Sequence, residues 1–545
     1  MFARKPPEPT THQTAPRPAE NVNSRVARWT ASRRATVVLG CMAFVLVALG
    51  AAASTARPVP SEQRSFGPGL RSGAAAQAPG CVPVPLATCG SVRVPLFWSR
   101  PSGPKIDVAY ALIHHRDQTL PRARGTVVLN VGGSNAPIID DAAMWTALFA
   151  DLLRDHDLLL IDPRGGGRSH PIHCGITSLP ATREGLVRAI EACGKRLGRQ
   201  ARAYTYAATA DDMNAVRKHL GIGKLELYGV STGTYLMTVF AQRHPRAVRS
   251  IVLSSAFPLR FDMWGRRNAQ ALRLAIRRVC ARSTTGKCNG ERTLRQLARL
   301  ARRLHAHPIP YRLNGQRRRL DDTALAGIAY QAGADSIIGQ IPAVVRAALG
   351  GDNRPLITAA SQLAPLVFSG SGVGDPAPRA HRTGTRGLDL ALAASLLCND
   401  YPTLWDRHAP IPVRLRQFAA RRARLRKAAF WPFSVRAWTS AIIDRGNGCI
   451  RWPDRNGPVQ RTTGPFPDVP VLVISGDLDT NVPTAEGRQA ARQFPHARVV
   501  NVPNAWHGPE REPTGCALSI TTNFIRNQRL GDTSCLAKIP PLPVS

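Results

Sequence analysis

The sequence predicts an α/β fold, in which a mostly parallel central sheet is covered by helices and carries a large, mainly helical insertion. After residue 90, short apolar and β-branched runs alternate with amphipathic segments. Such alternation is typical of parallel sheets that are buried on both faces. The alternation stops near residue 261 and resumes near residue 467, and the Arg-, Ala- and Leu-rich stretch between has helical spacing. With 43% hydrophobic residues among 545, the chain can bury a large core.

The first eighty residues predict export or membrane anchoring. Residues 1–34 are polar and end in several arginines, so we expect a cytoplasmic tail. The apolar residues 35–53 are long enough to form a signal or anchor segment that nearly spans a bilayer. Three alanines at 51–53 fit a cleavage site, whereas the long preceding tail favours an uncleaved anchor. Both alternatives place the rest of the chain outside the cytoplasm, secreted or anchored to the outer face of the membrane, after a linker at 54–80.

The cysteines agree with export. Ten of the 11 cysteines lie beyond the apolar segment, and an even number favours disulfides in an oxidising compartment, with reduced structural cysteines as the alternative. The sequence does not fix the connectivity. The simplest pattern joins neighbours along the chain, and each bond would contribute about 2–4 kcal/mol. That pattern pairs Cys81 with Cys89, Cys174 with Cys193, Cys280 with Cys288, Cys398 with Cys449, and Cys516 with Cys535.

The chain is strongly basic, with 73 Lys and Arg against 35 Asp and Glu and a formal net charge of +38. The arginines are spread along the sequence and no helix-turn-helix, zinc-finger or RNA-binding motif is present, so we expect no nucleic-acid partner. A solvated basic surface is the simplest interpretation, and binding of anionic cell-envelope polymers is the alternative. The Arg-dense stretch 414–427 is accordingly predicted to be a solvated helix face.

The elements divide the chain into three parts beyond the linker. A sheet-bearing core occupies 81–262 and 467–545, and a helical cap occupies 263–466. Helices are expected within the core at 210–220 and 232–243 and within the cap at 268–282 and 292–305. The expected strands are 108–114, 125–130, 157–162, 225–230, 250–254, 469–475 and 497–502.

The strongest local motif is Gly-Val-Ser-Thr-Gly at residues 229–233. It lies between a predicted strand and a predicted helix, the context of a nucleophile elbow, in which a tight turn presents a serine. The flanking glycines avoid side-chain clashes, and the helix N-terminus places N–H groups near developing negative charge. We therefore predict that Ser231 is the nucleophile of a serine hydrolase.

A serine nucleophile needs a base, and the base needs a carboxylate that orients it. In this arrangement the chain order is Ser, Asp, His. The strand 469–475 runs into a turn that contains Asp477 and Asp479, and the strand 497–502 leads to a loop with His507. We predict Asp479 as the orienting residue because it lies further along the turn, with Asp477 as the alternative, and His507 as the base.

Acyl transfer also needs N–H donors that stabilise an oxyanion. Thr232, directly after the nucleophile, is expected to supply one donor. The loop after the strand 125–130 contains paired glycines that allow close approach of the backbone, and we expect the second donor there from Gly133, with Ser134 as the alternative. The Gly-rich stretch 162–169 lacks the order of a phosphate-binding loop and is predicted to brace the site from beneath.

Together these motifs resemble the α/β-hydrolase superfamily and, more narrowly, the secreted tripeptidyl-aminopeptidase and prolyl-aminopeptidase-like serine peptidases of actinobacteria. The resemblance runs from about Cys81 to Cys535 and includes Cys-Asn-Asp at 398–400 and Cys-Ile-Arg-Trp at 449–452, which a generic lipase would not carry. It implies an α/β-hydrolase fold, a small peptide substrate and an aminopeptidase-like C-terminal segment with two triad members. Serine chemistry of this kind needs no metal or cofactor, so we expect none.

An aminopeptidase must recognise a free ammonium group, which calls for a carboxylate near the cap. Asp400 is one candidate, with Asp140 and Asp141 as others, and each has a structural role as its alternative. Ser134 is a further candidate for substrate binding. Two other functions stay open: an esterase or lipase that acts on cell-envelope acyl esters, and an inactive hydrolase-fold protein that binds anionic cell-wall polymers.

Overall fold

The computed structural model places most of the chain from Cys81 onward. The predicted tail, apolar segment and linker at 1–34, 35–53 and 54–80 lie outside the described residues. Among the helices that the structure describes, none has the length and apolar character needed to cross a bilayer. The described residues are 81–133, 137–176, 180, 182–284, 286, 288–313, 316–366, 391–442, 444–453 and 460–544.

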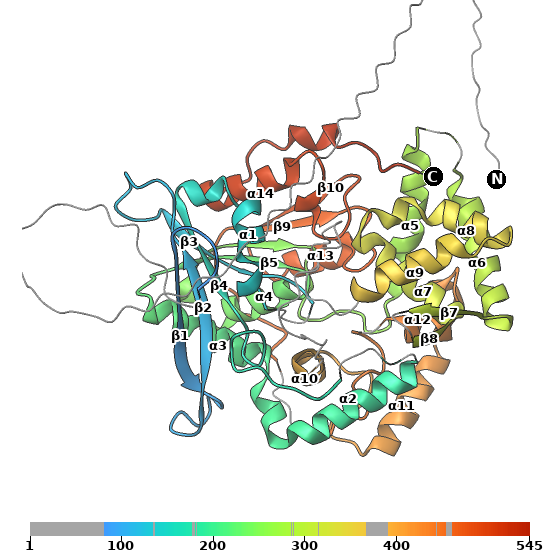
Figure 1. Cartoon of the computed structure of the whole chain (residues 1–545), viewed down its shortest axis with the longest axis horizontal. Helices are drawn as coiled ribbons and strands as arrows, with labels where there is room; N and C mark the ends of the chain where they lie inside the picture. The colour runs from blue at the N-terminus through green and yellow to red at the C-terminus, as the bar shows by residue number, and fades with distance from the viewer. Residues whose placement is uncertain are drawn as a thin grey trace, which may run out of the picture. The chain divides into compact units, whose positions relative to one another are not determined.

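The central sheet has eight strands in the order β1-β2-β4-β3-β5-β6-β9-β10 (Figure 1). The β1–β2 and β2–β4 pairs are antiparallel, and all the remaining pairs are parallel. The predicted α/β-hydrolase sheet is therefore confirmed, and β1 is an added edge strand beyond the seven expected. The strands are β1 (Ala87–Pro95), β2 (Lys105–Ile113), β3 (Gly125–Asn130), β4 (His156–Ile161), β5 (Leu225–Val230), β6 (Val248–Ser254), β9 (Val471–Gly476) and β10 (Ala497–Val502).

Helices cover both faces of the sheet, because successive strand residues point to opposite sides. On β3, Val127 and Leu129 belong to one hydrophobic core, whereas Val128 belongs to another. Figure 1 shows α1 and α14 on one side of the sheet and α3 and α4 on the other. The first core is covered by α1 (Ala142–Leu148) and α14 (Cys516–Asn527), and the second by α2 (Arg183–Leu197), α3 (Tyr206–His219), α4 (Thr232–Arg243) and α13 (Thr484–Ala491).

The predicted cap region has a hydrophobic core of its own. It differs from the prediction in two respects: it includes a two-stranded hairpin, and its helix α10 (Ala391–Asp400) contributes Leu392 and Leu396 to the core beside the sheet. The other elements of the region are α5 (Arg266–Arg282), α6 (Gly290–Ala306), β7 (Ile309–Leu313), β8 (Gln316–Leu320), α7 (Asp322–Gln331), α8 (Ile341–Leu349), α9 (Arg354–Leu366), α11 (Ile411–Ala423) and α12 (Val435–Ala441).

The arginine-dense helix α11 is only partly the solvated face that its composition predicts. Arg414 is buried, and its guanidinium donates hydrogen bonds to the carbonyls of Ala409 at 2.8 Å and Trp452 at 2.9 Å. The expectation was wrong for this residue because a guanidinium can satisfy several buried backbone carbonyls at once.

All five neighbour-to-neighbour disulfides of the simplest pattern are present. The bond between Cys398 and Cys449 closes the largest loop, with a sequence separation of 51, and ties α10 to the segment that follows α12. The bond between Cys516 and Cys535 ties α14 to the C-terminal segment. The prediction of this connectivity is confirmed.

Candidate active site

The turn between β5 and α4 is a strained strand-to-helix turn. Ser231 precedes the first residue of α4 and has φ +57° and ψ −127°, a conformation that costs a non-glycine residue about 1–3 kcal/mol. A Cβ at Gly233 would lie 2.1 Å from the carbonyl oxygen of Asn130, and a Cβ at Gly229 would lie 2.9 Å from the backbone of Gly233. Both glycines are therefore needed for the close packing of the turn.

Backbone hydrogen bonds fix the position of Ser231. Its N–H donates to the carbonyl of Ser254 at 3.0 Å, and its own carbonyl accepts from the Thr234 hydroxyl at 2.5 Å. The side chain is partly exposed, and among the described residues its hydroxyl makes no hydrogen bond. The loop after β3 approaches it closely, since a Cβ at Gly132 would lie 2.8 Å from the Ser231 Oγ.

His507 and Asp479 form a buried pair. The Asp479 Oδ2 lies 2.8 Å from His507 Nδ1, and because a carboxylate only accepts, this nitrogen carries the proton. The other carboxylate oxygen accepts from the N–H groups of Asn481 at 2.8 Å and Val482 at 2.9 Å. His507 is 8% exposed, and its backbone N–H donates to the Gly333 carbonyl at 3.0 Å. The imidazole is thus held in one tautomer with Nε2 left for a substrate or nucleophile.

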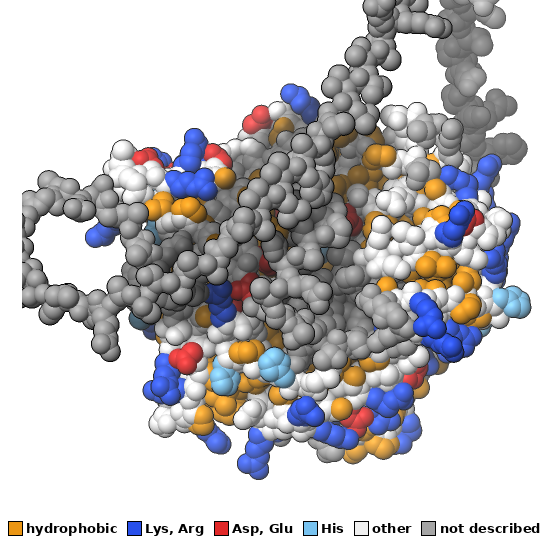
Figure 2. Space-filling view, in the orientation of Figure 1, with side chains coloured by type: hydrophobic (Ala, Val, Ile, Leu, Met, Phe, Trp, Pro, Cys, Tyr) orange, Lys and Arg blue, Asp and Glu red, His pale blue; other side chains and the backbone are white. Residues whose placement is uncertain are grey.

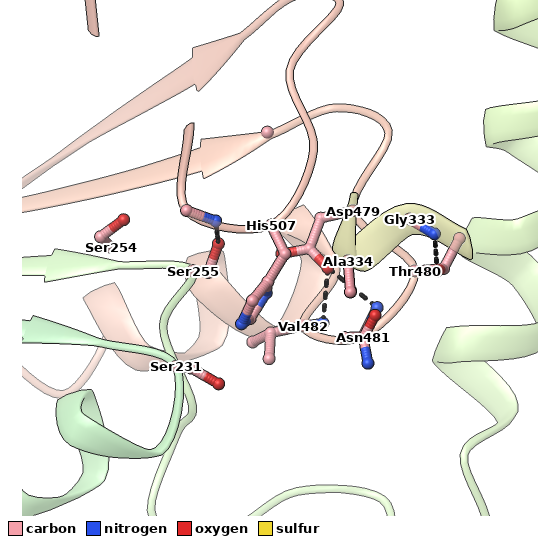
Figure 3. A network of polar contacts seen from close by, with 12 residues as sticks. Ser231, Ser254, Ser255, Gly333, Ala334, Asp479, Thr480, Asn481, Val482 and His507 are labelled. Carbon is pink, nitrogen blue, oxygen red and sulfur yellow. Dashed lines mark hydrogen bonds and ion pairs between the residues drawn. The ribbon is translucent and has the colours of Figure 1, made fainter. Parts of the chain in front are cut away.

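The histidine loop and the serine turn meet at the same edge of the sheet. The N–H of Gly508 donates to the Ser255 hydroxyl at 3.0 Å, and a Cβ at Gly508 would lie 3.8 Å from Val230. Figure 3 shows the His507 ring between the Asp479 carboxylate and Ser231. Ser231 and the pair of His507 and Asp479 therefore lie at one edge of the sheet, and the Ser231 hydroxyl makes no hydrogen bond to the imidazole.

Asp477, the alternative to Asp479, faces a different partner. Its carboxylate pairs with Arg282, with an Oδ2–Nη2 distance of 2.6 Å, and accepts from the N–H of Asn504 at 2.9 Å. Asp477 therefore anchors α5 and the loop after β10, whereas Asp479 faces the imidazole.

The two predicted oxyanion donors occupy different surroundings. Thr232 is buried as the first residue of α4, so its N–H lies at the helix N-terminus beside Ser231. Gly133 is exposed in the turn after β3 and has φ +80°. Ser134, the alternative donor and a candidate for substrate binding, lies outside the described residues. The contact of Gly132 with the serine was not anticipated, although the paired glycines were the signal for it.

The Gly-rich turn after β4 supports this loop from beneath. The carboxylate of Asp162 is buried and accepts from the N–H of Ile138 at 2.8 Å and of Ile139 at 3.0 Å. Arg164, also buried, pairs with Asp212 with a distance of 2.5 Å between Nη2 and Oδ1. Asp162 therefore fixes the chain just beyond the oxyanion loop, and burial raises the pKa of its carboxyl.

The three carboxylates predicted for ammonium recognition differ in their surroundings. Asp400 is buried, and its Oδ2 accepts from the N–H of Tyr206 at 2.7 Å, at the start of α3. Burial raises the pKa of this carboxyl to about 7. Asp140 pairs with Arg168 at 2.9 Å, and Asp141 is exposed.

Asp444 is a carboxylate that the sequence did not single out. It is half-buried, and among the described residues it forms neither a hydrogen bond nor an ion pair. Two guanidinium hydrogen bonds of Arg183 hold the backbone on either side of it, to the carbonyls of Ile442 at 2.8 Å and Arg445 at 2.6 Å. The charge of Asp444 interacts electrostatically with the nearby guanidinium groups of Arg183 and Arg445.

Tyrosines surround Asp444. Burial raises the pKa of Tyr330 and the charge of Asp444 raises it further, and the same two causes contribute for Tyr206 and Tyr401. The Tyr206 phenol also adjoins the side chain of Thr232, the residue after the candidate nucleophile. The charge of Asp444 therefore acts on three buried tyrosines, of which Tyr206 adjoins Thr232.

Among the described residues, no group of three or more His, Cys, Asp or Glu side chains could hold a metal ion.

Two family models match separate parts of the chain. Residues 125–274 match the family described as alpha/beta hydrolase fold, and residues 435–535 match the family described as TAP-like protein. The first match contains Ser231, and the second contains Asp479 and His507.

Curated relatives align over part of their length. A tripeptidyl aminopeptidase of Streptomyces lividans is 30% identical over 212 residues, which cover 34% of this chain and 38% of that protein. The serine protease Hip1 of Mycobacterium tuberculosis (strain ATCC 25618 / H37Rv) is 28% identical over 242 residues, or 41% of this chain and 44% of that protein. The chain thus matches less than half the length of these relatives. A proline iminopeptidase of Mycobacterium smegmatis with a crystal structure aligns with 80% of this chain and 97% of its own at 14% identity and a TM-score of 0.34.

Proposed function

We propose that this chain, which matches the alpha/beta hydrolase fold over residues 125–274 and the TAP-like family over 435–535, is a serine peptidase that releases short peptides or single residues from free N-termini. The observation that supports this most is the buried pair of His507 and Asp479 at the sheet edge beside the strained turn of Ser231. The names of the two aligned relatives, an aminopeptidase and a serine protease, favour peptides as substrates.

In the proposed reaction the Ser231 Oγ attacks the carbonyl carbon of the scissile bond. His507 Nε2 takes the hydroxyl proton, and the Asp479 carboxylate stabilises the imidazolium that forms. Collapse of the tetrahedral intermediate breaks the C–N bond, and His507 returns the proton to the leaving amine. Water then attacks the acyl-enzyme with His507 as the base, and Ser231 regains its proton as the acid product leaves.

The negative charge of the intermediate needs preorganised donors. The N–H groups of Thr232 and Gly133 fill this role in the proposal, with Gly132 allowing the loop to approach the serine. Because the α4 dipole points its positive end at the same place, the turn stabilises the oxyanion further.

Recognition of a free ammonium group falls to Asp444 in this proposal, and not to Asp400. Asp400 accepts a hydrogen bond from the N-terminus of α3. Because its pKa is raised to about 7, it is partly protonated at neutral pH and makes a poor anionic ligand. Asp444 has no ion pair among the described residues, and its charge acts on Tyr206, which adjoins Thr232. The guanidinium groups of Arg183 and Arg445 are close enough to stabilise the Asp444 carboxylate, and an ammonium group would bind it directly.

The cap at 263–466 is proposed to close over the sheet edge and to limit the length of the substrate. The η5 turn (Ala332–Ala334) supports this, since its Gly333 carbonyl bonds His507. Five disulfides support a location outside the cytoplasm, where such bonds persist.

The test compares covalent labelling with substrate preference. A fluorophosphonate should label the wild-type chain at Ser231 and leave Ser231→Ala unlabelled, and wild type should cleave aminoacyl- and peptidyl-nitroanilides. Turnover of short acyl esters alone would contradict the peptidase assignment and favour an esterase. Absence of labelling in a folded chain that binds anionic polymers would favour an inactive binder.

A further inference from the structure

A cavity of about 1150 Å³ lies in the cap region, lined by the start of α2, the β7–β8 hairpin and helices α7, α9 and α12. Figure 2 shows Lys and Arg side chains gathered over the hairpin. Six arginines line the cavity: Arg183, Arg312, Arg317, Arg318, Arg319 and Arg436.

The lining contains three acidic residues against six arginines, so the acidic charge offsets only part of the basic charge. Asp321 accepts from the N–H of Ala324 at 2.8 Å as the N-cap of α7, and Asp322 pairs with His305 at 3.1 Å. Glu184, the third acidic residue of the lining, is exposed and has no ion pair among the described residues. The cavity therefore keeps an excess of positive charge.

The hairpin places like charges against each other. Its register sets Arg312 opposite Arg317, and directly opposed like charges destabilise a strand pair. In the part of the chain that the structure describes, Arg317, Arg319 and Arg436 form no ion pair. An anion inside the cavity would relieve this repulsion and accept charge-assisted hydrogen bonds.

One residue of the cavity lining contacts the loop that carries Asp479. Gln331 lines the cavity, and its Oε1 accepts from the Asn481 side chain at 2.8 Å, two residues beyond Asp479. Arg183, also in the lining, holds the backbone on both sides of Asp444. The cavity therefore borders the loop that carries Asp479 and the segment that carries Asp444.

From this arrangement we infer that the cavity binds a carboxylate of the peptide substrate, so that the enzyme prefers anionic short peptides. The inference rests on the proposed peptidase function. The carboxylate has two sources, the C-terminus of a short peptide or an acidic side chain, and the same guanidinium groups recognise both.

Binding to the Ser231→Ala variant tests the inference without turnover. Isothermal titration calorimetry would compare three peptides: pentaalanine amide, pentaalanine with a free C-terminal carboxylate, and pentaalanine amide with Glu at the third position. We expect at least one anionic peptide to bind about 10-fold more tightly than the neutral amide, because one charge-assisted hydrogen bond contributes roughly that much affinity. The peptide that gains identifies the source of the carboxylate.

The arginine variants decide whether the cavity is responsible. When Arg317→Gln and Arg319→Gln are added to the Ser231→Ala variant, the affinity ratio of anionic to neutral peptide should fall to about 2-fold or less. Both side chains are exposed in the lining, so the substitutions remove their charge without disturbing the core. The matched control, Arg295→Gln with Arg299→Gln, changes two exposed arginines of α6 outside the cavity and should keep the advantage.

Equal affinity for the three peptides, or an advantage that survives Arg317→Gln and Arg319→Gln, would overturn the inference. Inorganic polyphosphate that binds with dependence on these arginines, while the peptides do not discriminate, would also overturn it and make the cavity a polyanion site. Hydrolysis by wild type is measured in parallel: failure to cleave any of the three peptides contradicts the proposed function and leaves the binding comparison valid.

Discussion

The sheet edge and the cap cavity both contain charged side chains, but the two regions differ in how many of these side chains are paired within the protein. At the sheet edge the carboxylates have protein partners: Asp479 bonds two N–H groups and His507, and Asp477 bonds Arg282. In the cavity the arginines converge with few carboxylates, and nearby Asp444 has no ion pair among the described residues.

The difference separates groups that the fold preorganises from groups that are left for a ligand. A group that must hold one geometry through a reaction benefits from fixed partners, because reorganising them would raise the barrier. A group that binds substrate must exchange water for the ligand, so an internal partner would compete with it. Substitutions of the preorganised groups should therefore change kcat/KM or stability, whereas substitutions of the ligand-binding groups should mainly change KM.

The largest effect is expected within the sheet edge, between its two aspartates. Asp479→Asn should lower kcat/KM by about 10⁴-fold with little loss of stability, because the amide no longer holds the His507 tautomer. Asp477→Asn replaces the ion pair with Arg282 by at most one neutral hydrogen bond and should lower the melting temperature while kcat/KM falls less than about 10-fold. Steady-state kinetics and thermal melts of both variants measure this. An equal loss of activity in the two would show that Asp479 has no special role.

Asp444 tests the cap side of the comparison. Asp444→Asn should raise KM for peptides with a free N-terminus about 10-fold, through loss of one charge-assisted contact, and leave kcat and the turnover of N-acetylated substrates unchanged. Asp107→Asn is the matched control, since Asp107 is an exposed carboxylate of β2 without an ion pair among the described residues. A KM change that is the same for acetylated peptides would refute ammonium recognition at Asp444.

The sheet and its edge were largely predictable from the sequence, because their signals are local. The run 225–230, the motif around Ser231 and the turn with Asp479 each combine a strand pattern with a position at its carboxyl end, and parallel strands bring those ends together. The simplest disulfide pattern, which joins neighbouring cysteines along the chain, was correct, although the sequence alone left the connectivity open.

The cap-side groups were not predictable, because their roles depend on residues distant in sequence. Asp400 and Asp444 both occur in the cap region, but only the fold shows that Tyr206, 194 residues away, already bonds Asp400. Arg414 resembles its exposed neighbours in sequence. Its buried guanidinium is satisfied by backbone carbonyls that are distant in sequence, such as that of Trp452. Composition predicts how many arginines a helix has, but not which of them finds buried acceptors.

The smallest effect is expected at Asp400, a cap-region carboxylate that is hydrogen-bonded within the fold and does not bind substrate in our proposal. Its folded pKa of about 7 lies above the ordinary value near 3.9, so the folded chain binds the proton more tightly than the unfolded chain. Its contribution to stability is therefore full below about pH 4 and is lost as the pH rises to about 7. Asp400→Asn should flatten this part of the pH dependence in urea melts.

Glu226→Gln is the control for that measurement, because burial raises the pKa of Glu226 to about 7 as well. Its removal should flatten the same pH range without altering the start of α3, which Asp400 holds through the Tyr206 N–H. If Asp400→Asn leaves the pH dependence intact and instead raises KM for free N-termini, Asp400 faces the substrate, and the division between fold-held and ligand-facing carboxylates fails at this residue.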